Sequence, residues 1–176
     1  MGLAVAYLLL VGCAMVFEEH LIFVPSRYPI GDWHPVGLQC EEVAFETQDR
    51  VRLHGWYCSV PHPRCISLMA HGNAGDITHR VDRITTWQQT LHVSVFVFDY
   101  RGYGGSAGQY NELGVYHGTR AAYRWLTADK GMEGDAPLDP GGMERRKAHD
   151  STGIAVFLLQ NVRLAGHASP NAWRGE

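Results

Sequence analysis

Hydrophobic and polar positions alternate along two early segments of the chain, residues 42–46 and 51–57. In the second segment, apolar residues or glycine occupy most odd positions, and mainly polar or bulky side chains occupy the even ones. A polar stretch, residues 47–50, separates the two segments. A period of two on either side of a short polar turn predicts an antiparallel hairpin with one covered face.

Farther along, the pattern changes to longer apolar runs. Cys65–Ala70 and Val93–Phe98 are almost continuously apolar, which is typical of strands buried on both faces. Each is followed by a loop and then by apolar residues at helical spacing, over Ile77–Leu91 and Glu112–Leu126. Asn111 is a suitable N-cap for the second helix. The repeated order of strand, loop and helix predicts an α/β fold with a parallel sheet and crossover helices.

The N-terminal residues 2–17 form an uncharged apolar run. A helix that crosses the hydrocarbon core of a membrane needs about 20 apolar residues, and at least about 17. The run is just short, but 21–24 are apolar again. We therefore expect residues 1–19 to be a single-pass anchor in the lipid bilayer. The alternatives are a cleaved signal peptide of a secreted protein, a lipoprotein signal acylated at Cys13, and a buried soluble helix. No Lys or Arg precedes Arg27, so the positive-inside rule predicts no orientation.

The pattern is weaker on either side of the α/β region. His20–Pro25 indicates a short strand, and the turn-rich residues 26–37 indicate a linker. After Lys130 the sequence is rich in glycine and proline, without periodicity, apart from one apolar run at 154–159. We therefore expect one unit over residues 20–130 and an unrelated or disordered tail over residues 131–176.

Composition narrows the class of protein. The 176 residues suit one domain, and 45% hydrophobic residues suffice for a core. A net charge of −3 with mixed signs argues against a nucleic-acid partner, and the basic triplet 145–147 indicates a solvated loop. The four cysteines form no C-x-x-C pair and lack the histidine spacing of a zinc site, so we expect neither a metal nor a cofactor. A Cys40–Cys58 disulfide stays open, because it depends on an oxidising compartment, and Cys65 indicates a buried free thiol.

Two loops carry candidate chemistry. Residues 71–75 read His-Gly-Asn-Ala-Gly between a predicted strand and a predicted helix. Such a tight loop leaves backbone N–H groups unpaired, and these stabilise an oxyanion in some enzymes. The alternative is an ordinary strand-to-helix turn. Residues 104–108 read Gly-Gly-Ser-Ala-Gly, which matches the G-x-S-x-G pattern of a serine nucleophile.

The two loops occur in a wider context. LMAHGNAGD is followed by VFVFDYRGYGGSAG, and LIFVPSRYP and EEVAFETQDRVRLHGWY precede both. Over about residues 20–127, this order resembles the α/β-hydrolase superfamily, and most closely its membrane-anchored abhydrolase-domain group, related to serine aminopeptidase-like hydrolases. The resemblance implies an α/β-hydrolase fold that begins with the hairpin. It also implies cleavage of ester, thioester or amide bonds in a small or acylated substrate, through an acyl-serine intermediate.

The resemblance assigns roles to individual residues. His71 and Gly72 match the oxyanion loop of the family, in which the backbone N–H of Asn73 would be the donor. Asp99, Arg101 and Gly102 match a loop that supports this corner, with an expected hydrogen-bonded pair between Asp99 and Arg101. The serine of that loop, here Ser106, is usually structural in the family. It also lies seven residues beyond Asp99, whereas a nucleophile elbow places its serine directly between strand and helix.

The family's nucleophile follows the fifth strand, and its acid and base come later. No G-x-S-x-G run occurs after Lys130. We therefore expect the first half of a hydrolase joined to an unrelated tail, inactive as written, as a frameshift, an early stop or a misplaced gene end would produce. Translation of the other two frames of the DNA tests the frameshift. Without a fifth strand, Cys65–Ala70 would be an exposed, aggregation-prone edge unless residues 154–159 cover it.

Two other interpretations stay open. One is an active hydrolase that uses Ser106 with an acid and a histidine from the tail; the candidates are Asp135, Asp139 and Asp150, with His149 or His167. Both histidines otherwise indicate exposed loop positions. The other is a membrane-tethered remnant or interaction module without catalysis.

Overall fold

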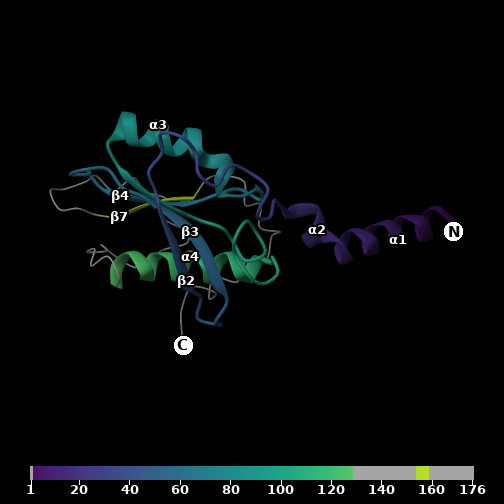
Figure 1. Ribbon diagram of the computed structural model, residues 1–176. Coiled ribbons are helices and arrows are strands. Elements are labelled where there is room, and N and C mark those ends of the chain that lie inside the picture. Colours follow the sequence, from purple (N-terminus) through teal and green to yellow (C-terminus); the bar gives the residue numbers. More distant parts are fainter. Residues whose placement is uncertain (1, 129–153, 159–176) are drawn as a thin grey trace.

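A five-stranded sheet forms the centre of the computed structural model, which describes residues 2–128 and 154–158 (Figure 1). The strand order is β2-β3-β6-β4-β7. The pairs β2–β3 and β3–β6 are antiparallel, and β6–β4 and β4–β7 are parallel. The strands are β2 (Glu41–Glu46), β3 (Arg52–Cys58), β4 (Ile66–Ala70), β6 (Ser94–Phe98) and β7 (Ile154–Leu158).

In the described part of the chain, one helix lies on each face of the sheet (Figure 1): α3 (Val81–Leu91) and α4 (Glu112–Ala128). All five residues of both β4 and β6 are buried, as their apolar runs predict. Along β6, Phe96 and Phe98 join the cluster packed against α4, whereas Val95 and Val97 join the cluster on the α3 side. The α/β layers predicted from the sequence are therefore present in the described residues.

The predicted hairpin is present, with Val43 paired to Gly55. The expectation of a single covered face is wrong for β3, because Trp56 is buried on the α3 side while Leu53 is buried against the α4 side. Covering helices on both faces explain this difference. A disulfide joins Cys40 to Cys58 at the open end of the hairpin, and Cys65 is a free thiol that is only half-buried.

Local capping explains where η1 (Ile77–Arg80) and α4 begin. The region expected as one helix from Ile77 starts as the 3-10 turn η1, whose N-cap Asp76 accepts from the Thr78 N–H at 2.9 Å, and α3 continues it from Val81 without a side-chain cap. The predicted N-cap of α4 is confirmed, since Asn111 Oδ1 accepts from the Gly114 N–H at 2.7 Å.

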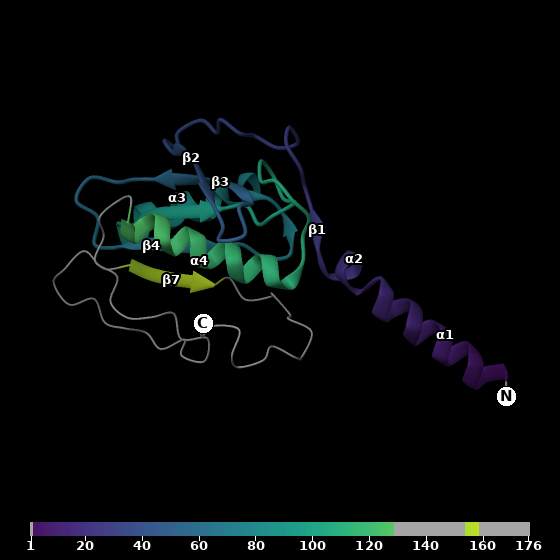
Figure 2. The ribbon, with the colours of Figure 1, turned by 90° about the horizontal axis from the view of Figure 1, so that it is seen from below.

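The edge of β4 is covered. β7 pairs with β4 from Ile66↔Ile154 to Ala70↔Leu158, and Figure 2 shows it beside β4 at the margin of the sheet. The condition that residues 154–159 cover this edge is thus met for 154–158. The rest of the expected tail lies outside the described residues, as do its basic triplet and both of its histidines.

The N-terminal segment contains two helices, α1 (Gly2–Val16) and α2 (Glu18–Ile22), and a short strand, β1 (Val24–Pro25). The strand predicted over His20–Pro25 is wrong for its first half, because the chain stays helical to Ile22. α1 projects away from the sheet and its helices (Figure 1). In the described part of the chain, no helix is both long and apolar enough to cross a membrane.

The disulfide gives a prediction that a thiol assay tests. In the unreduced, denatured protein, only Cys13 and Cys65 react with a maleimide, and all four cysteines react after reduction. Because the bridge closes a loop over a sequence separation of 18 residues, reduction lowers the free energy of unfolding by about 3 kcal/mol. Four reactive thiols before reduction would contradict the bridge.

Candidate functional site

Two loops meet at one edge of the sheet. Residues 71–76 follow β4, and residues 99–108 follow β6. Because β4 and β6 are parallel neighbours, their carboxyl ends lie side by side, and so do the loops that continue from them. This edge is where ligands bind in open α/β sheets. The predicted oxyanion residues and the glycine-rich loop are therefore brought together.

A strap, defined as residues 23–28, runs across both loops. Its Val24 and Ser26 N–H groups donate to the carbonyls of Asn73 at 2.9 Å and Gly75 at 3.1 Å, where β1 pairs with β5 (Ala74–Gly75). Farther on, the Tyr28 N–H donates to the Gly104 carbonyl at 3.1 Å, and the Gly104 N–H donates to the Ser26 carbonyl at 2.8 Å. The strap thus fixes the two loops relative to each other.

Asn73 is fixed through its carbonyl. That oxygen accepts from the Val24 N–H and from the Tyr103 hydroxyl at 2.6 Å. Burial raises the pKa of Tyr103, so its hydroxyl stays a donor. Within residues 2–128 and 154–158, the Asn73 N–H makes no hydrogen bond. A fixed peptide with an unused N–H is the arrangement that oxyanion binding needs.

His71 supports this loop from inside the core. Its side chain is fully buried, and its Nδ1–H donates to the Gly72 carbonyl at 2.7 Å. Tyr100 packs on the ring, with centroids 4.4 Å apart, and donates its hydroxyl proton to the His71 carbonyl. Burial lowers the pKa of His71, although the charge of Asp99 opposes the shift. The imidazole is therefore neutral, and it positions the loop.

Asp99 is a fully buried carboxylate between the two loops. Its Oδ1 accepts from the Ile77 N–H at 3.0 Å, and its Oδ2 accepts from the Gly105 N–H at 3.3 Å. His54 Nδ1 lies 3.6 Å from Oδ2, and His71 Nε2 lies 3.8 Å from Oδ1. The carboxylate therefore connects β3, η1 and both loops.

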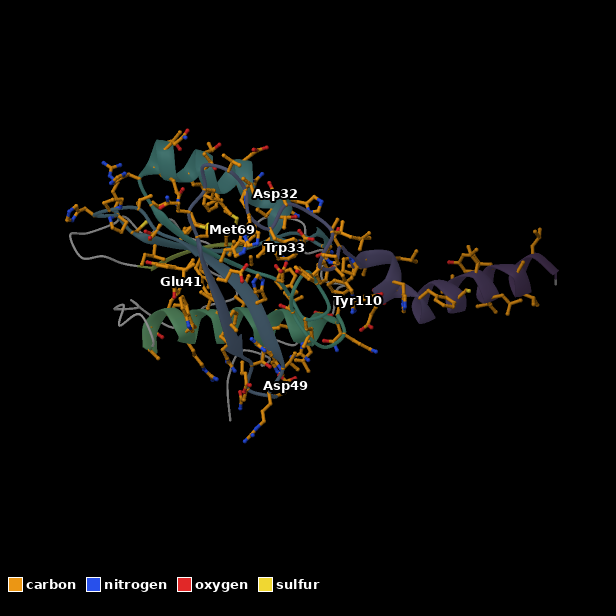
Figure 3. The ribbon with its side chains drawn as sticks, viewed as in Figure 1. Asp32, Trp33, Glu41, Asp49, Met69 and Tyr110 are labelled. Carbon is orange, nitrogen blue, oxygen red and sulfur yellow. A yellow bond between two sulfur atoms is a disulfide. The ribbon has the colours of Figure 1, made fainter. Side chains whose placement is uncertain are left out.

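The expected Asp99–Arg101 pair is wrong. Arg101 Nη2 instead donates to both carboxylate oxygens of Asp49, at 2.8 and 2.9 Å, and Figure 3 shows Asp49 at the tip of the β2–β3 hairpin. Partial burial raises the pKa of Asp49, but the hydrogen bonds from Thr47 and Arg101 and the Arg101 charge outweigh it and lower the pKa to about 2. A Cβ at Gly114 would lie 2.3 Å from Arg101 Cδ, so this glycine leaves room for the side chain.

Gly102, the third predicted residue of this loop, has a φ of +78°, and a Cβ there would lie 2.9 Å from the Tyr110 nitrogen. Both observations require glycine. The turn that follows brings Ser106 back toward the end of β6.

Ser106 bridges two backbone groups. Its hydroxyl donates to the Asp99 carbonyl at 2.8 Å and accepts from the His54 N–H at 2.9 Å, and the residue is 9% exposed. Within the described residues, no imidazole is hydrogen-bonded to this hydroxyl. A nucleophile needs a base within hydrogen-bond reach, so Ser106 has a structural geometry. The tail acids and histidines proposed as its partners lie outside the described residues.

His54 is the residue that sequence reasoning missed. It lines, with Ser106, Gly105 and Tyr28, an open hollow of about 460 Å³ beside the glycine-rich loop. The one sequence signal for His54 is its place in the alternating segment 51–57. That alternation does not predict that His54 lies near Asp99. In the parts of the chain that the structure describes, no cluster of three or more His, Cys, Asp or Glu side chains could hold a metal ion.

Known proteins share this arrangement in part. The chain is 38% identical to the uncharacterized protein MT2364 of Mycobacterium tuberculosis over 147 residues, which cover 79% of this chain and 49% of that protein. It is 32% identical to the alpha/beta hydrolase domain-containing protein WAV2 of Arabidopsis thaliana over 125 residues, which cover 66% and 40%. The chain thus spans about half the length, or less, of these curated relatives. No family model matches the chain.

Among solved structures, the chain resembles the esterase Pf2001 of Pyrococcus furiosus, with a TM-score of 0.52 and 23% identity over 62% of this chain and 44% of that one. This likeness concerns the fold alone. The described residues therefore have an α/β-hydrolase-like fold. The similarity to the relative that carries that name supports the α/β-hydrolase superfamily for this chain.

Two buried serines test the structural role of Ser106. Ser106→Ala removes a hydroxyl with two backbone partners, which leaves a buried N–H and a buried carbonyl unpaired, so it lowers the free energy of unfolding by about 2 kcal/mol. Ser67 is fully buried, and its hydroxyl has no partner among the described residues. Ser67→Ala therefore costs less than about 0.5 kcal/mol. Urea unfolding measures both, and equal effects would contradict the assigned role.

Buried His71 predicts a pH dependence. Its pKa is lowered in the folded state, so below the ordinary value of about 6.5 only the unfolded chain takes up the proton. The contribution of His71 to the free energy of unfolding is therefore fully present above pH 7. It falls as the pH drops below about 6.5, by up to about 1.4 kcal/mol per pH unit. Urea unfolding between pH 5 and 7 shows a shallower dependence for His71→Gln than for the exposed-site control His34→Gln. The same slope in both variants would exclude His71 as the cause.

Proposed function

We propose that this chain carries the oxyanion-binding half of a hydrolase that acts on ester, thioester or amide bonds of a small or acylated substrate. The support is the peptide of Asn73, whose carbonyl is fixed by two donors and whose N–H is unused within the described residues. In acyl transfer, such an N–H stabilises the negative oxygen of the tetrahedral intermediate. His71 and Gly72 serve this role by shaping the loop.

We also propose that the chain as written forms no acyl-serine. In the resembled family the nucleophile follows the strand beside β4, which is the position of β7. The four residues after Leu158 are Leu-Gln-Asn-Val, none of which is serine or cysteine, and the next serine is Ser169. Ser106 is a poor substitute, because its proton is already donated to the Asp99 carbonyl. A hydrolase with the Ser106 nucleophile and a non-catalytic interaction module are the two competing functions.

Attachment to a lipid bilayer is part of the proposal. The described side chains of α1 include Leu3, Leu8, Leu9 and Leu10, and each is more than half exposed. An all-round apolar helix is stable only when something apolar covers it, and α1 lies away from the body of the protein (Figure 1). The disulfide between Cys40 and Cys58 favours an oxidising, extracytoplasmic compartment for that body.

Ester turnover and active-site labelling test this function together. With p-nitrophenyl acetate we expect slow turnover that Ser106→Ala leaves within about twofold, because residual catalysis depends on the oxyanion loop and not on this serine. Asn73→Pro removes the proposed N–H donor and lowers turnover about a hundredfold. Asn73→Ala is the matched control, since it keeps the N–H. A fluorophosphonate labels neither the wild type nor Ser106→Ala, because neither protein has an activated serine.

Other outcomes identify the competing functions. Labelling and turnover that both disappear in Ser106→Ala would establish Ser106 as the nucleophile. If the protein is folded but neither the wild type nor any variant turns over the ester, the non-catalytic interaction module is the function that fits. Circular dichroism of Asn73→Pro shows whether lost turnover is merely lost structure.

A further inference from the structure

Apolar side chains are exposed on the end of the body from which α1 leaves. Leu21, Val24, Tyr28 and Ile30 are each more than half exposed, and we call them the strap patch. The α2 segment packs against the rest of the protein at this end. The ring centroid of Tyr110 lies 5.8 Å from that of His20 and 5.7 Å from that of Phe23. Figure 3 shows Tyr110 on the side of the body that faces α1.

The charge of this segment suits a phospholipid surface. Between Glu19 and Asp32, the only permanently charged side chain is that of Arg27, which is exposed. An isolated cation among apolar side chains can contact headgroup phosphates while its neighbours enter the acyl boundary. A partner without this layered polarity would leave either the guanidinium or the apolar groups uncompensated.

The length of α1 adds a constraint. Its 15 residues span about 22 Å at 1.5 Å per residue, whereas the hydrocarbon core is about 30 Å thick. A short apolar helix reduces this mismatch when the bilayer thins or when its flanking residues are drawn into the interface. The flanking residues here are α2 and the strap.

We propose that the strap patch docks on the bilayer surface, with the carboxyl edge of the sheet facing the membrane. This inference rests on the membrane attachment proposed for α1. The Val24 side chain contacts lipid, while its N–H holds the Asn73 carbonyl at 2.9 Å. The membrane contact is therefore one hydrogen bond away from the candidate oxyanion loop. The orientation brings that loop next to the lipid surface.

Spin labels locate the surface in the full chain reconstituted into phosphatidylcholine vesicles. The free thiols Cys13 and Cys65 are first replaced by serine, and a nitroxide is attached at Val24→Cys or Leu91→Cys. Leu91 is a matched control, because it is an exposed apolar residue at the end of α3, just before β6 starts at the opposite edge of the sheet. We expect lipid-soluble oxygen to relax the label at 24 several times more strongly than the label at 91.

The outcomes separate the two proposals. If the protein does not bind vesicles, both the attachment by α1 and the docking fail. If it binds but positions 24 and 91 are equally exposed to a water-soluble nickel complex, attachment stands and docking is overturned. Spin–spin broadening at position 24 would show that a second copy of the chain covers the patch, which also overturns docking.

Vesicle partitioning of a triple serine variant supplies a second measurement. The triple variant Leu21→Ser, Val24→Ser and Ile30→Ser weakens partitioning into phosphatidylcholine vesicles about tenfold or more, because three apolar side chains lose their lipid contact. Leu91→Ser leaves partitioning unchanged. Equal partitioning of the triple variant and the wild type would overturn docking, provided that both give the same circular dichroism spectrum.

Discussion

The buried carboxylate of Asp99 is the interaction on which the rest of the edge depends. It accepts hydrogen bonds from the N–H groups of Ile77 and Gly105, and it lies within 4 Å of two imidazoles, of His54 and His71. A buried charge without partners is very costly, so these elements must converge for the fold to be stable. A Cβ at Gly104 would lie 2.0 Å from Asp99 Oδ2, which explains why the turn around it is rich in glycine.

The same carboxylate decides what Ser106 does. Because the loop wraps around Asp99, it returns Ser106 to the backbone of β3 and to the Asp99 carbonyl. The hydroxyl closes the loop, and among the described residues no imidazole or carboxylate is hydrogen-bonded to it. The G-x-S-x-G pattern thus occurs here with its serine bonded to two backbone groups. The Asn73 N–H, unused within the described residues, lies on the neighbouring loop.

The strap makes the N-terminal segment part of this edge. A segment that the sequence indicates as a linker donates hydrogen bonds to both loops, and it follows α1 and α2 along the chain. The N-terminal helices and the site geometry are therefore joined by continuous backbone. Beside the pairing of β1 with β5, the Val24 N–H holds the Asn73 carbonyl at 2.9 Å.

The sequence by itself determined the layers, since continuous apolar runs, helical periodicity and the Asn111 cap follow from local chemistry. It also determined which loops meet, because parallel strands end at one edge. Only the tertiary structure decided that Arg101 binds Asp49 and that His54 faces Asp99. Both contacts join residues about fifty positions apart, and local patterns carry no information about such distances. The covering of β4 by β7 was also decided there, because strand pairing depends on which edges remain free.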